Sequence, residues 1–416
     1  MKNTFRAFRN RNYALFFCGQ SISQIGTWMQ RTAVSWVIYT LTHSAFMLGL
    51  SMFAMQFPSF LFSLLGGIAS DRYDRYKILL FTQTASMLQA LALAVLVLTG
   101  HYAVLQILML SVILGIVNAF DVPARQPLVH QLVSDKSELP NALALNSSMV
   151  NLAKLVGPAL SGIVLQKFGA GICFLLNAVS FVAVLTSLLL MKLPKQNISS
   201  EKKNIKQELS EGFTYLKQTP SISMVLLLLT TVSFLILPYD TLLPVFAKVV
   251  FKGDAATFGY ISSFIGLGAI TGTFFLASLK PGTDLKTVLL INTVVLGIGL
   301  LFFSRLDYFP LAMLFAVIFG FGNMAQTTIC ITLVQVHSAE HMRGRVMSFL
   351  VMGFFGMLPV GCLLIGSISQ KIGAQNTLFC QGITALLIAA VFSNFLRKDS
   401  LNKKEKQEFE EVEARL

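Results

Sequence analysis

Uncharged runs about as long as a membrane is thick constrain this chain more than any other feature. Residues 46–65 and 78–99 contain no charged side chain, and a helix of about 20 residues, rising ~1.5 Å per residue, crosses a hydrocarbon core of ~30 Å. Similar runs recur along the chain, and only 12% of all residues are charged, against about a quarter in soluble proteins. The sequence therefore predicts an all-α integral membrane protein.

We expect twelve membrane-spanning helices in two bundles of six. The polar stretch 192–220 has no apolar run, and it separates a bundle over 1–191 from a bundle over 221–396. Residues 205–216 in this linker are patterned as a short amphipathic helix, and 397–416 form a charged cytoplasmic tail. The predicted spans are 13–41, 46–69, 77–99, 103–121, 141–166, 172–191, 221–249, 256–279, 286–304, 309–336, 346–369 and 376–396.

The positions of the basic residues predict the orientation of these spans. Of the 32 lysines and arginines, two lie deep inside spans, and five lie at the ends of odd-numbered spans or just after them. This leaves 25 at the amino end, at the other connections, in the linker and in the tail. Cytoplasmic connections are enriched in Lys and Arg, so both termini are expected in the cytoplasm. The net charge of +13 is thereby explained by topology, and nucleic-acid binding is not expected.

A charged loop joins the second and third spans. Its Gly67, Asp71, Arg72 and Arg75 follow the order of the loop signature Gly-x-x-x-Asp-Arg-x-Gly-Arg-Arg/Lys of the major facilitator superfamily, which this segment resembles, although Asp74 replaces the second Gly. The small residues here favour close helix packing, and Asp71 is placed to cap a helix start. The alternative is a generic basic loop.

Further patches make the resemblance more specific. Residues 118–126, 139–146 and 151–162 closely resemble the branch of this superfamily that includes bacterial siderophore exporters, and Gly157-Pro158 resembles part of the antiporter motif of drug exporters. The alternative for Gly157-Pro158 is an ordinary kinked span. The resemblance implies a major facilitator fold in the inner membrane of a bacterium. It also implies a role in conformational gating for Gly67, Asp71, Arg72, Arg75, Asp121, Arg125, Gly157, Pro158, Arg343 and Arg345. The charged residues of this set are expected in inner loops.

Three charged side chains lie well inside the predicted spans: Arg31, Lys154 and Asp240. A charge at this depth costs about 2.5–3.5 kcal/mol on insertion scales, so each should face a cavity or a partner. Polar residues at helical spacing surround two of them and predict cavity-lining faces, with polar helix packing as the alternative. These faces are Gln20, Gln24, Thr27, Arg31 and Ser35 on the first span, and Ser147, Asn151, Lys154 and Pro158 on the fifth.

Asp240 lies between Pro238 and Pro244, in a seventh span that must be bent or broken there. A weak internal repeat, 44–53 with 255–264, makes it nearly equivalent to Arg31 in the other half. The resemblance implies that the first and seventh spans meet on the outer side, so we expect Arg31 and Asp240 to pair when the outer gate is closed. Protonation of Asp240 would then dissolve the pair and couple export to protons. The alternative is a static pair that neutralises two charges.

Lys154 is then left without an acid and predicts an anionic group on the substrate, unless the amine is neutral. The expected function is proton-coupled export of a small organic molecule such as a siderophore. The alternatives are multidrug efflux and a lipid or lysolipid flippase, while a membrane sensor is disfavoured because the cytoplasmic segments are short. Residues expected to bind substrate or couple transport are Gln24, Trp28, Arg31, Asn151, Lys154 and Asp240, with apolar groups from Met52, Met55, Phe234, Met352 and Met357.

Several classes of chemistry are not expected. The sequence has no nucleotide-binding loop and no nucleophile–base arrangement, so neither a cofactor nor enzymatic activity is predicted. The five cysteines show no paired spacing, and neither a disulfide framework nor a metal site is supported. The expected partners are the substrate, protons and membrane lipid, and the expected state is a monomer.

Overall fold

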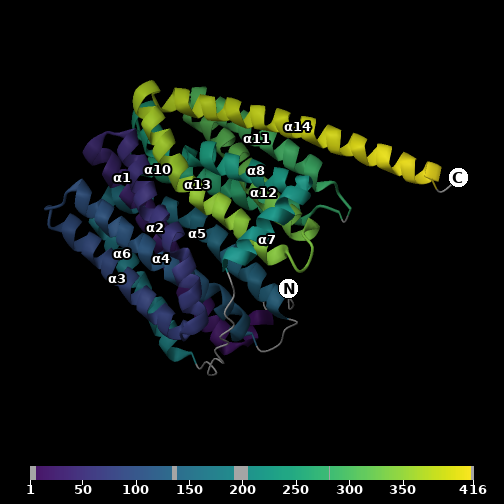
Figure 1. The fold of residues 1–416 in the computed structure, drawn as a ribbon. Coiled ribbons are helices and arrows are strands. Elements are labelled where there is room, and N and C mark those ends of the chain that lie inside the picture. Colours follow the sequence, from purple (N-terminus) through teal and green to yellow (C-terminus); the bar gives the residue numbers. More distant parts are fainter. Residues whose placement is uncertain (1–5, 134–137, 192–204, 281, 414–416) are drawn as a thin grey trace.

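Long helices follow one another along the chain. The computed structural model describes residues 6–133, 138–191, 205–280 and 282–413, and these residues form helices and no strand (Figure 1). A short 3₁₀ helix, Arg6–Arg9, comes first. The next six helices are α1 (Arg11–Thr42), α2 (Ala45–Arg72), α3 (Arg75–Leu98), α4 (Val104–Leu132), α5 (Leu139–Phe168) and α6 (Ala170–Leu190).

The second group of helices follows the linker helix α7 (Ile205–Gln218), which ends two residues after the predicted 205–216. Its first span is broken into α8 (Pro220–Leu235), η3 (Leu237–Leu242), α9 (Leu243–Val245) and η4 (Phe246–Val250). The remaining helices are α10 (Ala255–Ala277), α11 (Leu285–Arg305), α12 (Phe309–His337), α13 (Arg343–Ile372) and α14 (Ala374–Glu413).

The membrane spans agree with the prediction. Eleven segments of the described chain are long and apolar enough to cross a membrane, counting the broken span once. Helix α1, of 32 residues, is as long but carries the polar residues Gln20, Gln24, Gln30 and Arg31, and it completes the expected twelve. The all-α prediction is confirmed.

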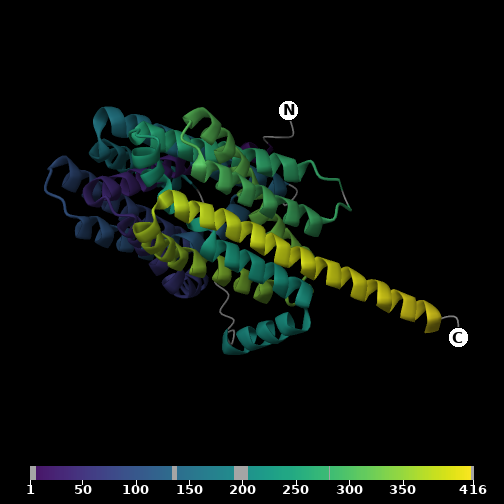
Figure 2. The same cartoon turned by 90° about the horizontal axis from the view of Figure 1, so that it is seen from above.

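The spans form two halves. Helices α1 to α6 pack on one another, as do α8 to α14, and Figure 1 shows them as a purple-to-blue and a green-to-yellow group. The halves meet mainly where α2 packs on α13 and α5 packs on α10. The linker helix α7 contacts α8 and α13 and lies beside the main body in Figure 2, and α14 continues beyond the bundle.

The contacts between the halves lie in the middle of the bundle and at one of its two ends. We call this end the opposite end, because it lies opposite the end where most of the basic connections are found. It holds the connections after α1, α5 and α13, whereas the basic end holds the connections after α2 and α4 and the linker. Ser44 donates a hydrogen bond to Gln370 there, at 3.0 Å. The Oγ of Ser263 donates to the carbonyl oxygen of Leu155 in the middle, at 3.0 Å. The hydrogen bonds between described residues of the two halves thus close the opposite end.

The loop between α2 and α3 corrects the expected helix cap and confirms the close packing expected of its small residues. Asp71 lies in the last turn of α2, and it is Asp74 that caps α3, accepting a 2.9 Å hydrogen bond from the backbone N–H of Tyr76. Close packing is provided by Gly66, where a Cβ would collide with the carbonyl of Ala119, whereas a Cβ on Gly67 would meet nothing within 4 Å. The residue that departs from the superfamily signature therefore provides the cap.

Helix α4 is longer than expected, and this corrects the placement of Asp121 and Arg125. The predicted span ended at residue 121, but the helix continues to Leu132 through two prolines. Asp121 and Arg125 therefore lie within a helix and not in a loop. The Oγ of Ser70 donates a 3.0 Å hydrogen bond to the carbonyl of Pro123, and such side-chain donors make prolines tolerable in membrane helices.

Buried amides connect four helices of the amino-terminal half. The Nδ2 of Asn177 on α6 donates to Gln30 Oε1 on α1 at 2.8 Å, and Gln30 Nε2 donates to Gln89 Oε1 on α3 at 3.0 Å. The Nε2 of Gln89 donates in turn to the carbonyl of Leu110 on α4, at 3.1 Å. Each of the three amide side chains is nearly inaccessible. Apolar residues fill the rest of each half, with Phe174 in one and Phe319 in the other.

Candidate functional site

The seventh span is broken where the prolines predicted it. The α-helix stops at Leu235, and Leu237–Leu242 continue as a 3₁₀ helix. Pro238 and Pro244 have no backbone N–H to donate, so the regular hydrogen-bond pattern cannot run through this segment. Asp240 lies in the 3₁₀ stretch.

Arg31 and Asp240 form the predicted ion pair. The Nη2 of Arg31 lies 3.1 Å from Asp240 Oδ2, and the two side chains keep 27% and 44% of their surface exposed. The sulfur of Met52 lies 3.8 Å from the same Nη2. Because Arg31 belongs to α1 and Asp240 to the broken span, the pair connects the two halves.

Trp28 lies between two cations. Its ring centroid is 5.0 Å from the guanidinium carbon of Arg31 and 5.5 Å from Lys154 Nζ, and both distances suit a cation–π contact. Gly157 brings α5 against this side chain, since a Cβ at Gly157 would lie 2.5 Å from the Cβ of Trp28. Four of the predicted residues are thus brought to one place: Trp28 and Arg31 on α1, Lys154 on α5 and Asp240 on η3.

The charges at this site do not cancel. Arg31 is paired with Asp240, whereas Lys154 has neither a hydrogen bond nor an ion pair among the described residues. Gln24 and Asn151 are half-buried on the faces that carry Arg31 and Lys154, and no described hydrogen bond joins either one to the pair. The site therefore carries one positive charge in excess when both basic side chains are protonated.

The other charged residues of the prediction lie near the basic end. Asp71 and Arg75 are 3.6 Å apart, and Asp121 and Arg125 are 2.8 Å apart, each pair within the amino-terminal half. Arg345 pairs at 2.7 Å with Glu211 of the linker helix. Arg72 and Arg343 are exposed. In this conformation the described ion pairs of the set do not bridge the halves.

Pro158 contributes to the contact between the halves, whereas Gly157 packs against α1. A Cβ on Gly259 of α10 would lie 2.6 Å from the carbonyl oxygen of Pro158. A Cβ on Gly266 would lie 3.0 Å from the Cα of Leu155. The segment that resembles an antiporter motif is therefore the part of α5 on which α10 packs.

The sequence did not point to two amides near Asp240, the half-buried Asn323 and the buried Gln381. The Nδ2 of Asn323 on α12 donates to the hydroxyl of Tyr239 at 2.9 Å. The Nε2 of Gln381 on α14 donates to the carbonyls of Leu235 and Ile236, at 2.8 and 3.2 Å. Each amide lies within a predicted membrane span, where a polar side chain needs a partner, and that need was the available signal.

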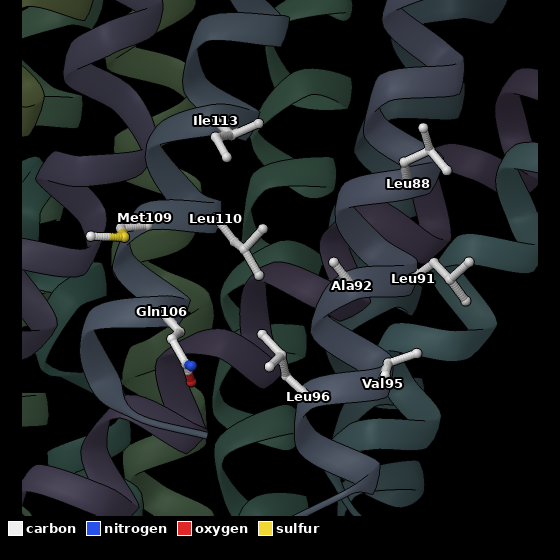
Figure 3. A pocket seen from close by; sticks show the side chains of 9 residues that line it. All are labelled: Leu88, Leu91, Ala92, Val95, Leu96, Gln106, Met109, Leu110 and Ile113. Atoms are coloured by element: carbon white, nitrogen blue, oxygen red, sulfur yellow. The ribbon is translucent and has the colours of Figure 1, made fainter. Parts of the chain in front are cut away.

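An apolar groove on the outside of the bundle is unrelated to these charges. It has a volume of about 660 Å³ and lies between α3 and α4, lined by nine residues of which Gln106 alone is polar (Figure 3). Its residues belong to the amino-terminal half, and they include exposed side chains such as Leu88 and Met109. A surface of this kind suits lipid chains.

The family of the chain follows from a comparison with protein families. The family model of transmembrane secretion effectors, which is part of the major facilitator superfamily, matches residues 2–415. The chain belongs to this family. It is a membrane transporter, as the resemblance implied, and the predicted major facilitator fold is confirmed.

Relatives of this secretion effector include transporters of siderophores and of drugs. The staphyloferrin A transporter of Staphylococcus aureus is 28% identical, over 94% of this chain and 98% of its own length. An enterobactin exporter of Salmonella typhimurium is 27% identical over 79% of this chain and 78% of its own. The macrolide efflux protein A of Streptococcus pyogenes is 23% identical over 90% and 93%.

Solved transporters share the fold of this secretion effector. A bacterial homologue of the human lysosomal transporter Spinster superposes with a TM-score of 0.71 at 14% identity, covering 92% of this chain and 96% of that one. A transporter of the POT family in complex with 5-aminolevulinic acid superposes with a TM-score of 0.75 at 13% identity, covering 94% and 96%.

Proposed function

We propose that this secretion effector exports a small anionic organic molecule, such as a siderophore, in exchange for protons. It acts as a monomer in the inner membrane of a bacterium, with both termini in the cytoplasm. The observation that carries the proposal is the Arg31–Asp240 pair, which connects the halves beside an unpaired Lys154. The halves that move are the bundles 1–191 and 221–396.

The ion pair supplies the coupling step. With the opposite end facing outward, the described contacts correspond to a state closed to the outside. A proton that binds Asp240 from the outside removes its negative charge and weakens its attraction to Arg31, so the closed state loses stability relative to the open one. The substrate leaves outward, and release of the proton inward restores the pair.

The charged residues of the basic end act in the opposite state. In this proposal Asp71, Arg72 and Arg75 hold the inner ends of the halves together when the outer end opens, with Asp121, Arg125, Arg343 and Arg345 alongside them. The exposure of Asp71 and Arg72 in the present conformation leaves them accessible to such partners. Gly157 and Pro158 let α5 bend and pack as the contact with α10 changes.

Lys154 sets the charge of the substrate in this scheme. An ammonium group has three N–H donors and recognises a carboxylate or a catecholate as a point charge. Trp28 lies beside it and offers an aromatic face to an organic group. Gln24 and Asn151 add amide donors and acceptors on neighbouring faces. Siderophore transport by relatives supports this choice of substrate.

Multidrug efflux is the second candidate, because the relatives also include a macrolide efflux protein. Such a pump would carry bulky, often cationic molecules. The excess of positive charge at Trp28 disfavours cationic substrates, since like charges repel most strongly at low dielectric. The two functions therefore differ in the charge of the molecule transported.

Uptake into inside-out vesicles under an imposed proton gradient tests the proposal. Wild type, Asp240→Asn and a matched control, Asp307→Asn, would be compared, since Asp307 is an exposed acid in the connection after α11. We expect gradient-driven uptake of an anionic siderophore that is lost in Asp240→Asn and kept in Asp307→Asn. Uptake that survives Asp240→Asn would refute the coupling role, and preferential uptake of lipophilic cations would favour drug efflux.

A further inference from the structure

The break in the seventh span leaves the backbone carbonyl of Leu235 without its α-helical donor. In a continuous helix the carbonyl of Leu235 would accept from the N–H of Tyr239, but that N–H donates to Ile236 at 3.1 Å. The next N–H that could continue the α pattern, four residues after Ile236, belongs to Asp240 in the tighter 3₁₀ turn. Unsatisfied carbonyls inside a membrane protein cost free energy unless a neighbour donates to them.

Gln381 of α14 supplies that donor. Its Nε2 lies 2.8 Å from the carbonyl oxygen of Leu235 and 3.2 Å from that of Ile236, and only 3% of the residue is exposed. Its Oε1 has no hydrogen-bond partner among the described residues. The side chain therefore interacts through its amide N–H groups, at the point where the α-helix changes to the 3₁₀ form.

The 3₁₀ form decides where Asp240 points. A 3₁₀ helix turns ~120° per residue and an α-helix ~100°. Four residues after Ile236, the direction of a side chain consequently differs by about 80° between the two forms. In the 3₁₀ form the Asp240 carboxylate reaches Arg31 of the other half.

Two further contacts fix the segment from other sides. The hydroxyl of Tyr239 accepts from Asn323 at 2.9 Å, and its ring packs edge-on against Phe319 with centroids 5.0 Å apart. On α13, Gly361 leaves room for the break, since a Cβ there would lie 2.8 Å from the Cγ of Pro238. Among the described residues, Gln381 alone of these neighbours donates to the freed carbonyl of Leu235. Its second bond goes to the carbonyl of Ile236, which also accepts from the N–H of Tyr239.

We propose that Gln381 is a positioning residue for the Arg31–Asp240 pair, holding the break in the form that directs Asp240 at α1. The importance of Gln381 for transport rests on the proposed coupling role of Asp240. The position of the carboxylate can nevertheless be measured without transport.

A double-mutant cycle on thermal stability makes that measurement. The Tm of purified protein would be compared for wild type, Asp240→Asn, Gln381→Leu and the double variant. We expect Asp240→Asn to lower Tm in wild type, and to lower it by less than about half as much in Gln381→Leu, because residues that act through each other are not additive. A purely structural role for Gln381 would lower Tm without changing the effect of Asp240→Asn.

Two other variants complete the design. Gln326→Leu is the matched control, since Gln326 is a fully buried glutamine of the same half whose amide atoms have no partner among the described residues. It should leave the effect of Asp240→Asn unchanged. If Gln381→Leu does not accumulate, Gln381→Glu replaces it, because a neutral carboxylic acid retains one donor and should give an intermediate result.

The outcomes separate this inference from the proposed function. Equal Tm effects of Asp240→Asn with and without Gln381, or no effect of Asp240→Asn at all, would overturn the positioning role. The positioning role would also be overturned if Gln326→Leu reduced the Tm effect of Asp240→Asn by as much as Gln381→Leu does. If transport in vesicles does not depend on Asp240 while the double-mutant cycle gives the expected result, the proposed function is refuted. The positioning role of Gln381 is then still supported.

Discussion

Gly162 of α5 and Gly259 of α10 face each other with no room for a side chain on either. A Cβ on Gly259 would lie 2.9 Å from the Cα of Gly162, and one on Gly162 would lie 3.1 Å from the Cα of Gly259. Small residues permit this close approach of helix backbones in membranes. Because the helices belong to different halves, the closed opposite end depends on this pair.

Gly259→Ala should therefore open the opposite end. Overpacking costs about 1–3 kcal/mol, which lowers the ratio of closed to open molecules at least about fivefold. The measurement is the disulfide yield between cysteines introduced at Ser44 and Gln370, whose side chains are hydrogen-bonded in the closed state. Gly344→Ala is the control, because a Cβ there meets nothing within 4 Å; an equal yield in both variants would contradict the expectation.

Lys154→Met should weaken transport of anionic substrates. A hydrogen bond to a charged group contributes about 1.5–3 kcal/mol, so the KM for an anionic siderophore should rise about tenfold or more. Lys154→Arg keeps the charge and should retain most of the affinity. Uptake kinetics in vesicles check both, and an unchanged KM in Lys154→Met would remove Lys154 from the binding site.

Asp121→Ala should destabilise the protein more than any change at Asp71. Asp121 is buried and accepts hydrogen bonds from Thr82 at 2.9 Å and Gln83 at 2.6 Å, besides its 2.8 Å pair with Arg125. Removing one partner of a buried pair costs about 3–5 kcal/mol. Thermal unfolding in detergent measures the loss, and a Tm within error of wild type would exclude this structural role.

Asp71→Asn should slow transport without changing the stability of the protein. The Asp71 side chain is 75% exposed and 3.6 Å from Arg75, and exposed pairs contribute less than about 1 kcal/mol. We expect an unchanged amount of protein in the membrane and an unchanged Tm, together with slower transport. Transport at the wild-type rate would count against a gating role for this loop.

The stability of α11 should depend on pH through Asp284. The hydroxyl of Thr287 donates to its carboxylate at 2.6 Å and holds the pKa of Asp284 below its ordinary value of 3.8, aided by the backbone N–H of Lys286. A lowered pKa in the folded state means that the stabilisation is present above about pH 4 and is lost as the pH falls through the folded pKa.

Asp284→Ala tests this dependence. Loss of an N-terminal helix cap costs about 0.5–1 kcal/mol at an exposed site, so Tm should fall at pH 7 and fall by less at about pH 3. Asp307→Ala removes an exposed acid that caps no helix and serves as the control. A Tm difference for Asp284→Ala that is the same at both pH values would contradict the assignment.

The ion pair was predictable from the sequence, and several of its surroundings were not. Three charges within apolar spans needed partners, and Asp240 was the one acid among them. The internal repeat and the resemblance to the superfamily then favoured Arg31 over Lys154 as its partner. Two nearby prolines likewise predicted the broken span. Gln381 could not be assigned in this way, because a single glutamine in an apolar run does not reveal which carbonyls of another helix it will meet.

Local rules failed where tertiary contacts compensated for them. The predicted fourth span ended at residue 121, but the helix continues through Pro123 and Pro127. Ser70 of another helix donates to the carbonyl of Pro123, which the missing N–H of Pro127 leaves without a helical donor. Asp71 and Asp74 are both plausible caps by residue type, and the actual start of α3 at Arg75 selects Asp74. The gating roles of Asp71, Arg72, Arg343 and the others stay predictions.

The chain of amides through Gln30, Gln89 and Asn177 makes the two halves mechanically unlike. Sliding α1, α3, α4 or α6 past one another would leave amide groups bare in a hydrocarbon interior, where no water can replace the lost bonds. Tilting the whole amino-terminal half breaks none of them. The amino-terminal half therefore moves as one rigid body, whereas the other half contains a broken helix, which Gln381 and Asn323 hold in place beside Asp240.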